Sequence, residues 1–327
     1  MKKNNFKLFF SMVTVIMVVL FGSVFTSCNN DDDLLLAGDS QTELVSSLAQ
    51  DSVVGKTRSI LDYNSVETSE GWSLNSNLDM GSNYGFKVYE KNGNYLQKVN
   101  LSMGAIITNG FGSSYYNEAL PESPLYKRKK ISHFWSIRPT KALSVTNCAY
   151  FGFNDINIDE SNAPLSFPVK WNNSMLTIGS DNTQSNKRML IFSFSNQCAY
   201  VQSYNVTQNN PSQINSAIPY TFAICGFSPS GNFQASSLFS LGRTMIGIKD
   251  QDGDGKKEVV YILTANALQL SAKSMLEDLG CSSSDIIMFD GHLSTGMIAR
   301  NPSTGYQVNF QIDQRTIPHV IYVLRPW

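Results

Sequence analysis

Asp290 is the residue of this sequence whose position best suits chemistry. It directly follows the apolar run 286–289, and Gly291, Ser294 and Thr295 come next. A carboxylate at the C-terminal end of an inner strand, beside a glycine turn and two hydroxyls, is a frequent arrangement in active sites. The alternative is an aspartate that caps its own turn through backbone hydrogen bonds. The residues alone leave both interpretations open.

Arg243 and Asn147 also stand at the ends of strand patterns. Arg243 precedes the apolar stretch 245–248, where a guanidinium can bind an anionic group through two hydrogen bonds. It can equally pair with a structural carboxylate. The amide of Asn147 can bind a sugar or phosphate oxygen, or it can belong to a turn. If these residues are functional, we expect them to meet Asp290 and Arg315 around one cleft.

A second motif has the spacing of a calcium loop. Asp250, Asp252 and Asp254 form D-x-D-x-D-G, which places oxygen ligands at loop positions 1, 3 and 5. The twelfth position holds Tyr261 in place of glutamate, so a complete EF-hand is absent. Because the run separates two strand patterns, a plain Asp-Gly hairpin turn is the alternative. Calcium is the one cofactor we consider, and it would stabilise the turn without doing chemistry.

Other chemistries lack their sequence signatures. There is no G-x-S-x-G elbow, Walker loop, H-E-x-x-H pair or dinucleotide fingerprint, and three histidines cannot supply a histidine-rich metal site. The formal net charge of −1 offers no basic excess for phosphate backbones, so we expect no nucleic-acid partner. The oligomeric state cannot be read from the sequence.

The last third of the chain contains the elements that must position Arg243 and Asp290. It predicts a strand over 243–248, a turn over 250–255, a strand over 258–263, a helix capped by Ser271 and ended by Gly280, a strand over 284–289 and a final strand over 320–324. This unit of strand, hairpin, helix and strand follows a body of short strands. The predicted fold class is therefore α+β, with strand-rich mixed sheets and a few helices.

The body before it alternates short apolar stretches with turn signals. Asn92-Gly93 marks a hairpin, and 142–153 is predicted to be a buried strand and its exit. The basic run 127–130 is expected to be a solvated loop or strand edge, with a polyanion contact as the alternative. Cys148, Cys198, Cys225 and Cys281 form no C-x-x-C pair, so their pairing stays undetermined.

The N-terminal residues predict an export signal followed by a lipid attachment site. Three lysines precede the apolar run 8–22, which is too short to span a membrane comfortably and suits a signal-peptide core. The stretch 25–28 resembles a bacterial lipobox, with Cys28 as the lipidated residue. The acidic run that follows resembles the surface-export signal of Bacteroidetes lipoproteins. We expect attachment to the outer membrane through this lipid anchor only, at the cell surface or the periplasmic face.

The domain organisation follows from this interpretation. Residues 1–28 are a signal peptide, 29–58 a tether and 59–327 one domain, with a strand-rich part over 59–140 and a motif-bearing part over 141–327. Removal of the signal peptide leaves 22 basic and 26 acidic residues, a net charge of −4. An anionic substrate would therefore need a local basic site.

The order of these motifs resembles the phosphodiester glycosidase domain family. The matching segments are Asn147-Cys148-Ala149-Tyr150-Phe151, Arg243-Thr244-Met245-Ile246-Gly247, a hairpin, a helix ending at Leu279-Gly280, Phe289-Asp290-Gly291 with Ser294-Thr295, and Arg315-x-x-Pro318. The family pattern is roughly N-G-G-F-F, R-x-A-x-G, L-D-G-G-G-S-S/T and R-x-V-x-N. The resemblance extends from about residue 85 to about residue 325.

The resemblance implies a hydrolase that cleaves a sugar-1-phosphodiester, of the N-acetylglucosamine-phosphate type, in a glycan or glycolipid. By position, Asp290 and Arg243 would be catalytic. The substrate-binding residues would be Asn147, Phe151, Gly291, His292, Ser294, Thr295, Arg315 and His319. Arginines would neutralise the phosphate, and the carboxylate would act as acid, base or nucleophile at the anomeric centre.

Three departures from the family pattern favour an alternative. The glycines after the aspartate are replaced by His292-Leu293, Cys148-Ala149 occupies the place of two more glycines, and His319 replaces the last asparagine. The alternative function is a surface lipoprotein that binds phosphorylated glycans with altered or lost catalysis. Either histidine can replace a lost contact, or each is simply packed or exposed.

Overall fold

The computed structural model describes residues 65–119, 121–152, 161–181, 183–206, 210–230, 239–313 and 315–326. The predicted signal peptide, Cys28, the acidic run and the whole predicted tether lie outside these residues, as do residues 59–64 of the predicted domain. Within the described ranges, no helix is both long and apolar enough to cross a membrane.

The largest element is a sheet of eleven strands. Its main path is β1 (Ser73–Leu74), β2 (Phe86–Lys91), β3 (Asn94–Asn100), β15 (Val259–Ala267), β14 (Leu241–Lys249), β16 (Ile286–Phe289), β13 (Phe222–Phe227), β11 (Lys187–Ser193) and β12 (Cys198–Tyr204). Off this path, β9 (Val169–Trp171) pairs with β13, and β10 (Ser174–Thr177) pairs with β9. Strands from both predicted parts of the domain thus share one sheet.

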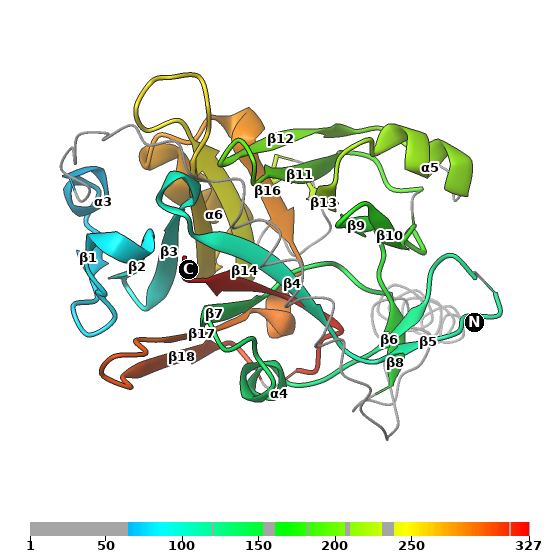
Figure 1. The fold of residues 1–327 in the computed structure, drawn as a ribbon, viewed down its shortest axis with the longest axis horizontal. Coiled ribbons are helices and arrows are strands. Elements are labelled where there is room, and N and C mark those ends of the chain that lie inside the picture. The colour runs from blue at the N-terminus through cyan, green and yellow to red at the C-terminus, as the bar shows by residue number, and fades with distance from the viewer. Residues whose placement is uncertain are drawn as a thin grey trace, which may run out of the picture.

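A second sheet packs against it (Figure 1). Its strands in spatial order are β18 (Gln307–Gln311), β17 (Gly296–Arg300), β7 (Ala142–Asn147), β19 (His319–Leu324) and β4 (Ile106–Phe111). A small third sheet contains β5 (Ser114–Tyr115), β6 (Leu125–Lys127) and β8 (Asn162–Pro164). The pairings between described strands are antiparallel.

Helices are few and short. The α-helices with described bounds are α3 (Ser65–Ser69), α4 (Ile131–Ser136), α5 (Pro211–Ala217) and α6 (Gln269–Asp278). The 3-10 turns are η1 (Ser82–Tyr84), η2 (Leu101–Met103), η4 (Ser283–Asp285) and η5 (His292–Ser294). Helix α6 packs on β14 and β15, and α4 packs on β7 and β17. The predicted α+β class with a strand-rich body is confirmed.

Alternation along the strands produces two cores. On β14, Ile246 faces the space between the two sheets, together with Val145 and Ile321 of the second sheet. The preceding residue, Met245, faces the other side of the large sheet, where Leu276 of α6 covers it. Because both faces of the large sheet are covered here, β14 is buried nearly throughout, Arg243 and Thr244 included.

The predicted C-terminal unit is confirmed as β14, β15, α6 and β16, with two corrections. Residues 284 and 285, predicted to begin the last of these strands, lie in the 3-10 turn η4. Ser271 does not cap α6, because the helix begins at Gln269 with Leu268 at the N-cap position. Strand β15 ends at Ala267, so the chain turns directly into the helix and Ser271 lies within its first turn. Gly280 follows the helix at φ 89°, in the left-handed region that glycine adopts most easily.

The basic run 127–130, predicted to be a solvated loop or strand edge, is buried in its first half, whereas Lys129 is half-buried and Lys130 is exposed. Lys127 ends β6 at 2% exposure, and Arg128 is 1% exposed. Backbone pairing continues through the run, since Lys127 pairs with Asn162 of β8 and Lys129 bridges to Ile317. Tertiary packing thus overrides the tendency of a charged run to remain in water.

All four cysteines of the described domain are free and buried. Burial raises the pKa of the Cys225 thiol, and it raises that of Cys281 to about 12. These thiols therefore remain protonated and behave as small apolar side chains.

Candidate active site

The pairing of β14 with β16 brings Asp290 beside Arg243. Thr244 lies opposite Phe289 in this antiparallel pair, so the next residue of β16 and the preceding residue of β14 emerge at the same edge. The Asp290 amide also donates to the carbonyl of Cys148, with 2.8 Å between nitrogen and oxygen. This bond ties the end of β16 to the chain that leaves β7.

Asn147 joins the two sheets at this edge. Its Nδ2 donates to the Asp290 carbonyl at 2.6 Å. Its Oδ1 accepts from Thr244 Oγ1 at 2.7 Å and from the Gly296 amide at 3.1 Å. The side chain is 1% exposed. Asn147 therefore positions the strand ends around Asp290, while its contact with a substrate stays a prediction.

The carboxyl group of Asp290 is perturbed. Burial raises its pKa from 3.8 to about 6, although the nearby Ser294 hydroxyl, the Arg315 guanidinium, the Gly291 amide and Arg128 all favour the charged form. Oδ2 is buried without a hydrogen-bonding partner among the described residues. The residue as a whole is half-buried. A bound ligand can supply the hydrogen bond that its buried oxygen lacks, so Asp290 is a candidate functional residue.

Two arginines act on this carboxyl, and the register of β14 and β16 places a third, Arg243, opposite Asp290. Arg315 and Arg128 act on Asp290 electrostatically, as above. Burial and the charge of Asp290 raise the pKa of the Tyr150 phenol, and Arg243 opposes that rise. Tyr150 therefore lies within the fields of both Asp290 and Arg243. The fold thus gathers a local positive charge that the chain as a whole does not have.

Arg128 was not identified as a site residue from the sequence. Its guanidinium lies 5.6 Å from the ring centroid of Phe151, a predicted substrate-binding residue. Phe151 is itself 6% exposed and bridges to Leu165. The available signal was the basic run itself, whose alternative interpretation was contact with an anion. The structure turns this charge inward, toward Asp290.

Arg243 is held by backbone carbonyls. Its Nε donates to the Ala267 carbonyl at 3.2 Å, and one terminal nitrogen donates to the Phe239 carbonyl at 3.3 Å. Burial lowers its pKa, and the guanidinium stays charged at any working pH. The strand entrance thus presents a fixed, nearly buried cation.

His319 supplies a neutral donor. Its Nδ1 accepts from the Ala149 amide at 3.1 Å, so Nε2 carries the proton. Nε2 is buried without a partner among the described residues, and the Phe111 ring lies 4.5 Å away between centroids. Burial lowers the pKa of His319 to about 3, which keeps the ring uncharged at neutral pH.

The loop after Asp290 turns back toward β14. The Ser294 amide donates to the Gly291 carbonyl at 3.1 Å, within the turn η5. Ser294 Oγ and Thr295 Oγ1 are buried and have no hydrogen-bonding partner in the described structure. Ser294 ends η5 and Thr295 follows it, so two buried hydroxyls without such a partner stand four and five residues after Asp290.

His292 adopts a backbone conformation suited to glycine, with φ at 58°. Its ring is half-buried, and its pKa is lowered first by burial and then by Arg315 and Arg243, against Asp313. The loop thus holds a left-handed backbone conformation at a residue other than glycine, which is uncommon. His292 shares the electrostatic environment of the arginines, and its role in binding stays a prediction.

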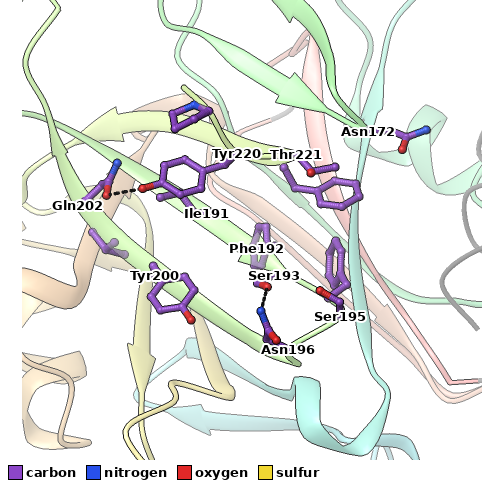
Figure 2. A pocket seen from close by; sticks show the side chains of 14 residues that line it. Asn172, Ile191, Phe192, Ser193, Ser195, Asn196, Tyr200, Gln202, Tyr220 and Thr221 are labelled. Carbon is purple, nitrogen blue, oxygen red and sulfur yellow. Dashed lines mark hydrogen bonds between the residues drawn. The ribbon is translucent and has the colours of Figure 1, made fainter. Parts of the chain in front are cut away.

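A separate groove lies on the outer part of the large sheet. It has a volume of about 790 Å³ and lies between residues of β11, β12 and the start of β13. Figure 2 shows its aromatic lining, in which Tyr220 donates to Gln202 Oε1 at 3.1 Å. None of the predicted site residues lines it. We place the candidate active site at Asp290 because the perturbed and unsatisfied groups lie there.

The fold and the site define an α+β sandwich protein in which a half-buried aspartate with one buried oxygen lies near three arginines, at an edge where the sheets meet. Comparisons of the sequence with family models and with curated proteins gave no match.

Two solved structures are distantly similar. One is a hypothetical protein from Synechocystis, with 11% identity and a TM-score of 0.41 over 74% of this chain and 62% of that one. The other is the zebrafish N-acetylglucosamine-1-phosphodiester alpha-N-acetylglucosaminidase catalytic domain, auto-inhibited by its pro-peptide. It has 12% identity and a TM-score of 0.40 over 68% of this chain and 83% of that one. This chain thus spans less than two thirds of the Synechocystis protein.

Proposed function

We propose that this protein is a hydrolase that cleaves a sugar-1-phosphodiester linkage, of the N-acetylglucosamine-phosphate type, in a glycan or glycolipid. The observation that carries the proposal is the buried carboxyl of Asp290, with a pKa of about 6 and an unsatisfied oxygen, among Arg128, Arg243 and Arg315. The motif order described above supports the same reaction class.

The arginines suit the phosphate. A guanidinium binds two phosphate oxygens in one plane and keeps its charge when buried. As the bond between the anomeric carbon and the phosphate oxygen breaks, negative charge moves onto the phosphate. Fixed cations such as Arg243 stabilise that charge without having to reorganise.

The carboxyl of Asp290 suits the anomeric carbon. Ordinary glycosidases use two carboxyl groups, one of which protonates the leaving oxygen. A phosphodiester leaves as a stable anion, so the arginines replace that acid and one carboxylate is sufficient. Asp290 then acts as nucleophile or as general base toward water. Water adds to the anomeric carbon, and the phosphate departs with the bridging oxygen as a monoester.

The neutral donors suit the sugar. His319 Nε2, Ser294 Oγ and Thr295 Oγ1 are buried and without partners among the described residues. Hydroxyl and carbonyl groups of a bound sugar can satisfy all three, which would orient the ring against Asp290.

The test is the release of free sugar from a panel of sugar-1-phosphodiesters by the mature chain without its lipid. We expect Asp290→Asn to abolish turnover, and Arg243→Ala and Arg128→Ala to reduce it by at least about a hundredfold. Asp278→Asn and Arg325→Ala are matched controls, since both residues lie outside the site.

Three outcomes separate the possibilities. Loss of activity in the site variants alone supports the hydrolase and its assignment. Binding of the substrates by calorimetry without turnover supports the glycan-binding alternative. Equal turnover in the wild type and in Asp290→Asn would refute the assignment of this site.

We further propose that Cys28 carries the lipid anchor and that the enzyme acts at the outer membrane. Metabolic labelling with a fatty acid and fractionation test this directly. Cys28→Ser should lose the label and leave the membrane fraction, whereas Cys281→Ser should retain both.

A further inference from the structure

The loop between β14 and β15 gathers four carboxyl groups. Asp250, Asp252, Asp254 and Glu258 each offer one oxygen, and these oxygens lie within 4.8 Å of one another. The loop joins the end of β14 to the start of β15, whereas Arg243 lies near the opposite end of the same pair. The cluster is therefore separate from the candidate active site.

Glu258 gives the independent indication of a ligand. It is 4% exposed, and its Oε1 accepts from the Gln251 amide at 3.0 Å. Its Oε2 is buried and has no hydrogen-bonding partner in the described part of the chain. A buried carboxylate oxygen without a partner is rare in folded proteins.

The loop backbone already fixes the three aspartates. Asp250 accepts from the amides of Gly253 at 2.7 Å and Gly255 at 2.8 Å. Asp252 accepts from the Asp254 amide at 3.2 Å, and Asp254 accepts from the Lys256 amide at 2.9 Å. Each carboxylate has about four acceptor positions, so these bonds leave oxygen lone pairs available. The preorganised side chains would lose little entropy on binding an ion.

We propose that this loop binds one calcium ion through Asp250, Asp252, Asp254 and Glu258. Calcium takes six to eight oxygen ligands, and carboxylates, backbone carbonyls and waters all serve. Glu258, at the ninth position of the loop, supplies the carboxylate that the motif lacks at its twelfth position, Tyr261. The Tyr261 hydroxyl is engaged elsewhere, since it donates to Glu67 at 2.5 Å.

The ion would join three parts of the fold. The Glu258 carbonyl accepts from the Leu101 amide at 2.8 Å, next to η2. The adjacent Lys257 carbonyl accepts from the Ala199 amide of β12 at 2.9 Å. Fixing this loop thus stabilises contacts to β12 and to the region after β3, without reaching Asp290.

Calorimetric titration of the mature chain, treated with EDTA and then dialysed, tests the site with CaCl2 and with MgCl2. We expect one calcium per chain with a Kd of roughly 10⁻⁵ to 10⁻³ M, and weaker binding of magnesium. Saturating calcium should raise Tm by a few degrees, because the ion binds the folded state.

Variants decide whether these residues hold the ion. Asp252→Asn and Glu258→Gln should each weaken calcium binding at least about tenfold, since each removes a charged ligand. Asp278→Asn and Glu122→Gln are the matched controls and should bind as the wild type does. Asp252 is exposed, so its substitution tests the site without threatening folding.

The absence of both heat and a Tm shift at 10 mM calcium would overturn the proposal. Wild-type affinity in both Asp252→Asn and Glu258→Gln would do the same. Neither result would bear on sugar release, which depends on Asp290 and the arginines.

Discussion

Replacement of Asp290 by asparagine should stabilise the folded protein in a pH-dependent way. The folded-state pKa of this carboxyl is about 6, against an ordinary value of 3.8. Between pH 3.8 and about pH 6, the carboxyl is deprotonated in the unfolded chain but still protonated in the folded chain. The free energy of unfolding of the wild type therefore falls as the pH rises through this range. At about 1.36 kcal/mol per pH unit, the loss sums to about 3 kcal/mol.

Asparagine resembles the protonated carboxyl in shape and charge. The variant and the wild type should therefore be similarly stable near pH 4, and the variant should gain up to about 3 kcal/mol by pH 8. For a domain of this size the gain corresponds to roughly 5–10 °C in Tm. The same substitution should abolish turnover, so stability and activity would move in opposite directions.

Urea unfolding, followed by tryptophan fluorescence from pH 4 to pH 8, measures the difference directly. Asp278→Asn serves as the control, because its exposed carboxyl should give a difference near zero throughout. A difference that is flat with pH, or a variant that is less stable at pH 8, would refute the reasoning. Either result would mean that the attraction of Arg128 and Arg315 for the Asp290 carboxylate outweighs the cost of burying its charge.

Other substitutions test the remaining parts of the site. Asn147→Ala should cost roughly 2–3 kcal/mol of unfolding free energy in urea, because it leaves the Asp290 carbonyl and the Thr244 hydroxyl without their partner. Gly242→Ala should cost about 1–3 kcal/mol and lower turnover, because a Cβ there would lie 2.1 Å from the His292 carbonyl oxygen and displace the loop. His319→Gln should make the protein less sensitive to acid. The folded pKa of His319 is about 3, so wild-type stability is lost as the pH falls below 6.5, by about 3 kcal/mol at pH 4. Acid unfolding curves of the two proteins that coincide would contradict this.

Local patterns were enough to predict the C-terminal unit. The apolar stretches 245–248 and 286–289 predicted strands, and Gly280 marked the end of α6, since each pattern depends on neighbouring residues alone. The cap at Ser271 was misplaced because the exact start of a helix depends on where the preceding strand ends. The calcium spacing was visible in the sequence, whereas the contribution of Glu258 depends on its burial beneath the turn.

The sequence by itself determined the chemistry available to this protein: which residues carry a carboxyl, guanidinium or imidazole, and which short strands deliver them. Only the tertiary structure decided which of them meet. The fold brings Arg128 close enough to Asp290 to favour its charged form. Burial keeps His319 neutral, and the bond from the Ala149 amide leaves its proton on Nε2. Contacts between residues far apart in the chain, and the loss of water around them, set these properties. The spacing of neighbouring residues determines neither these long-range contacts nor the exclusion of water.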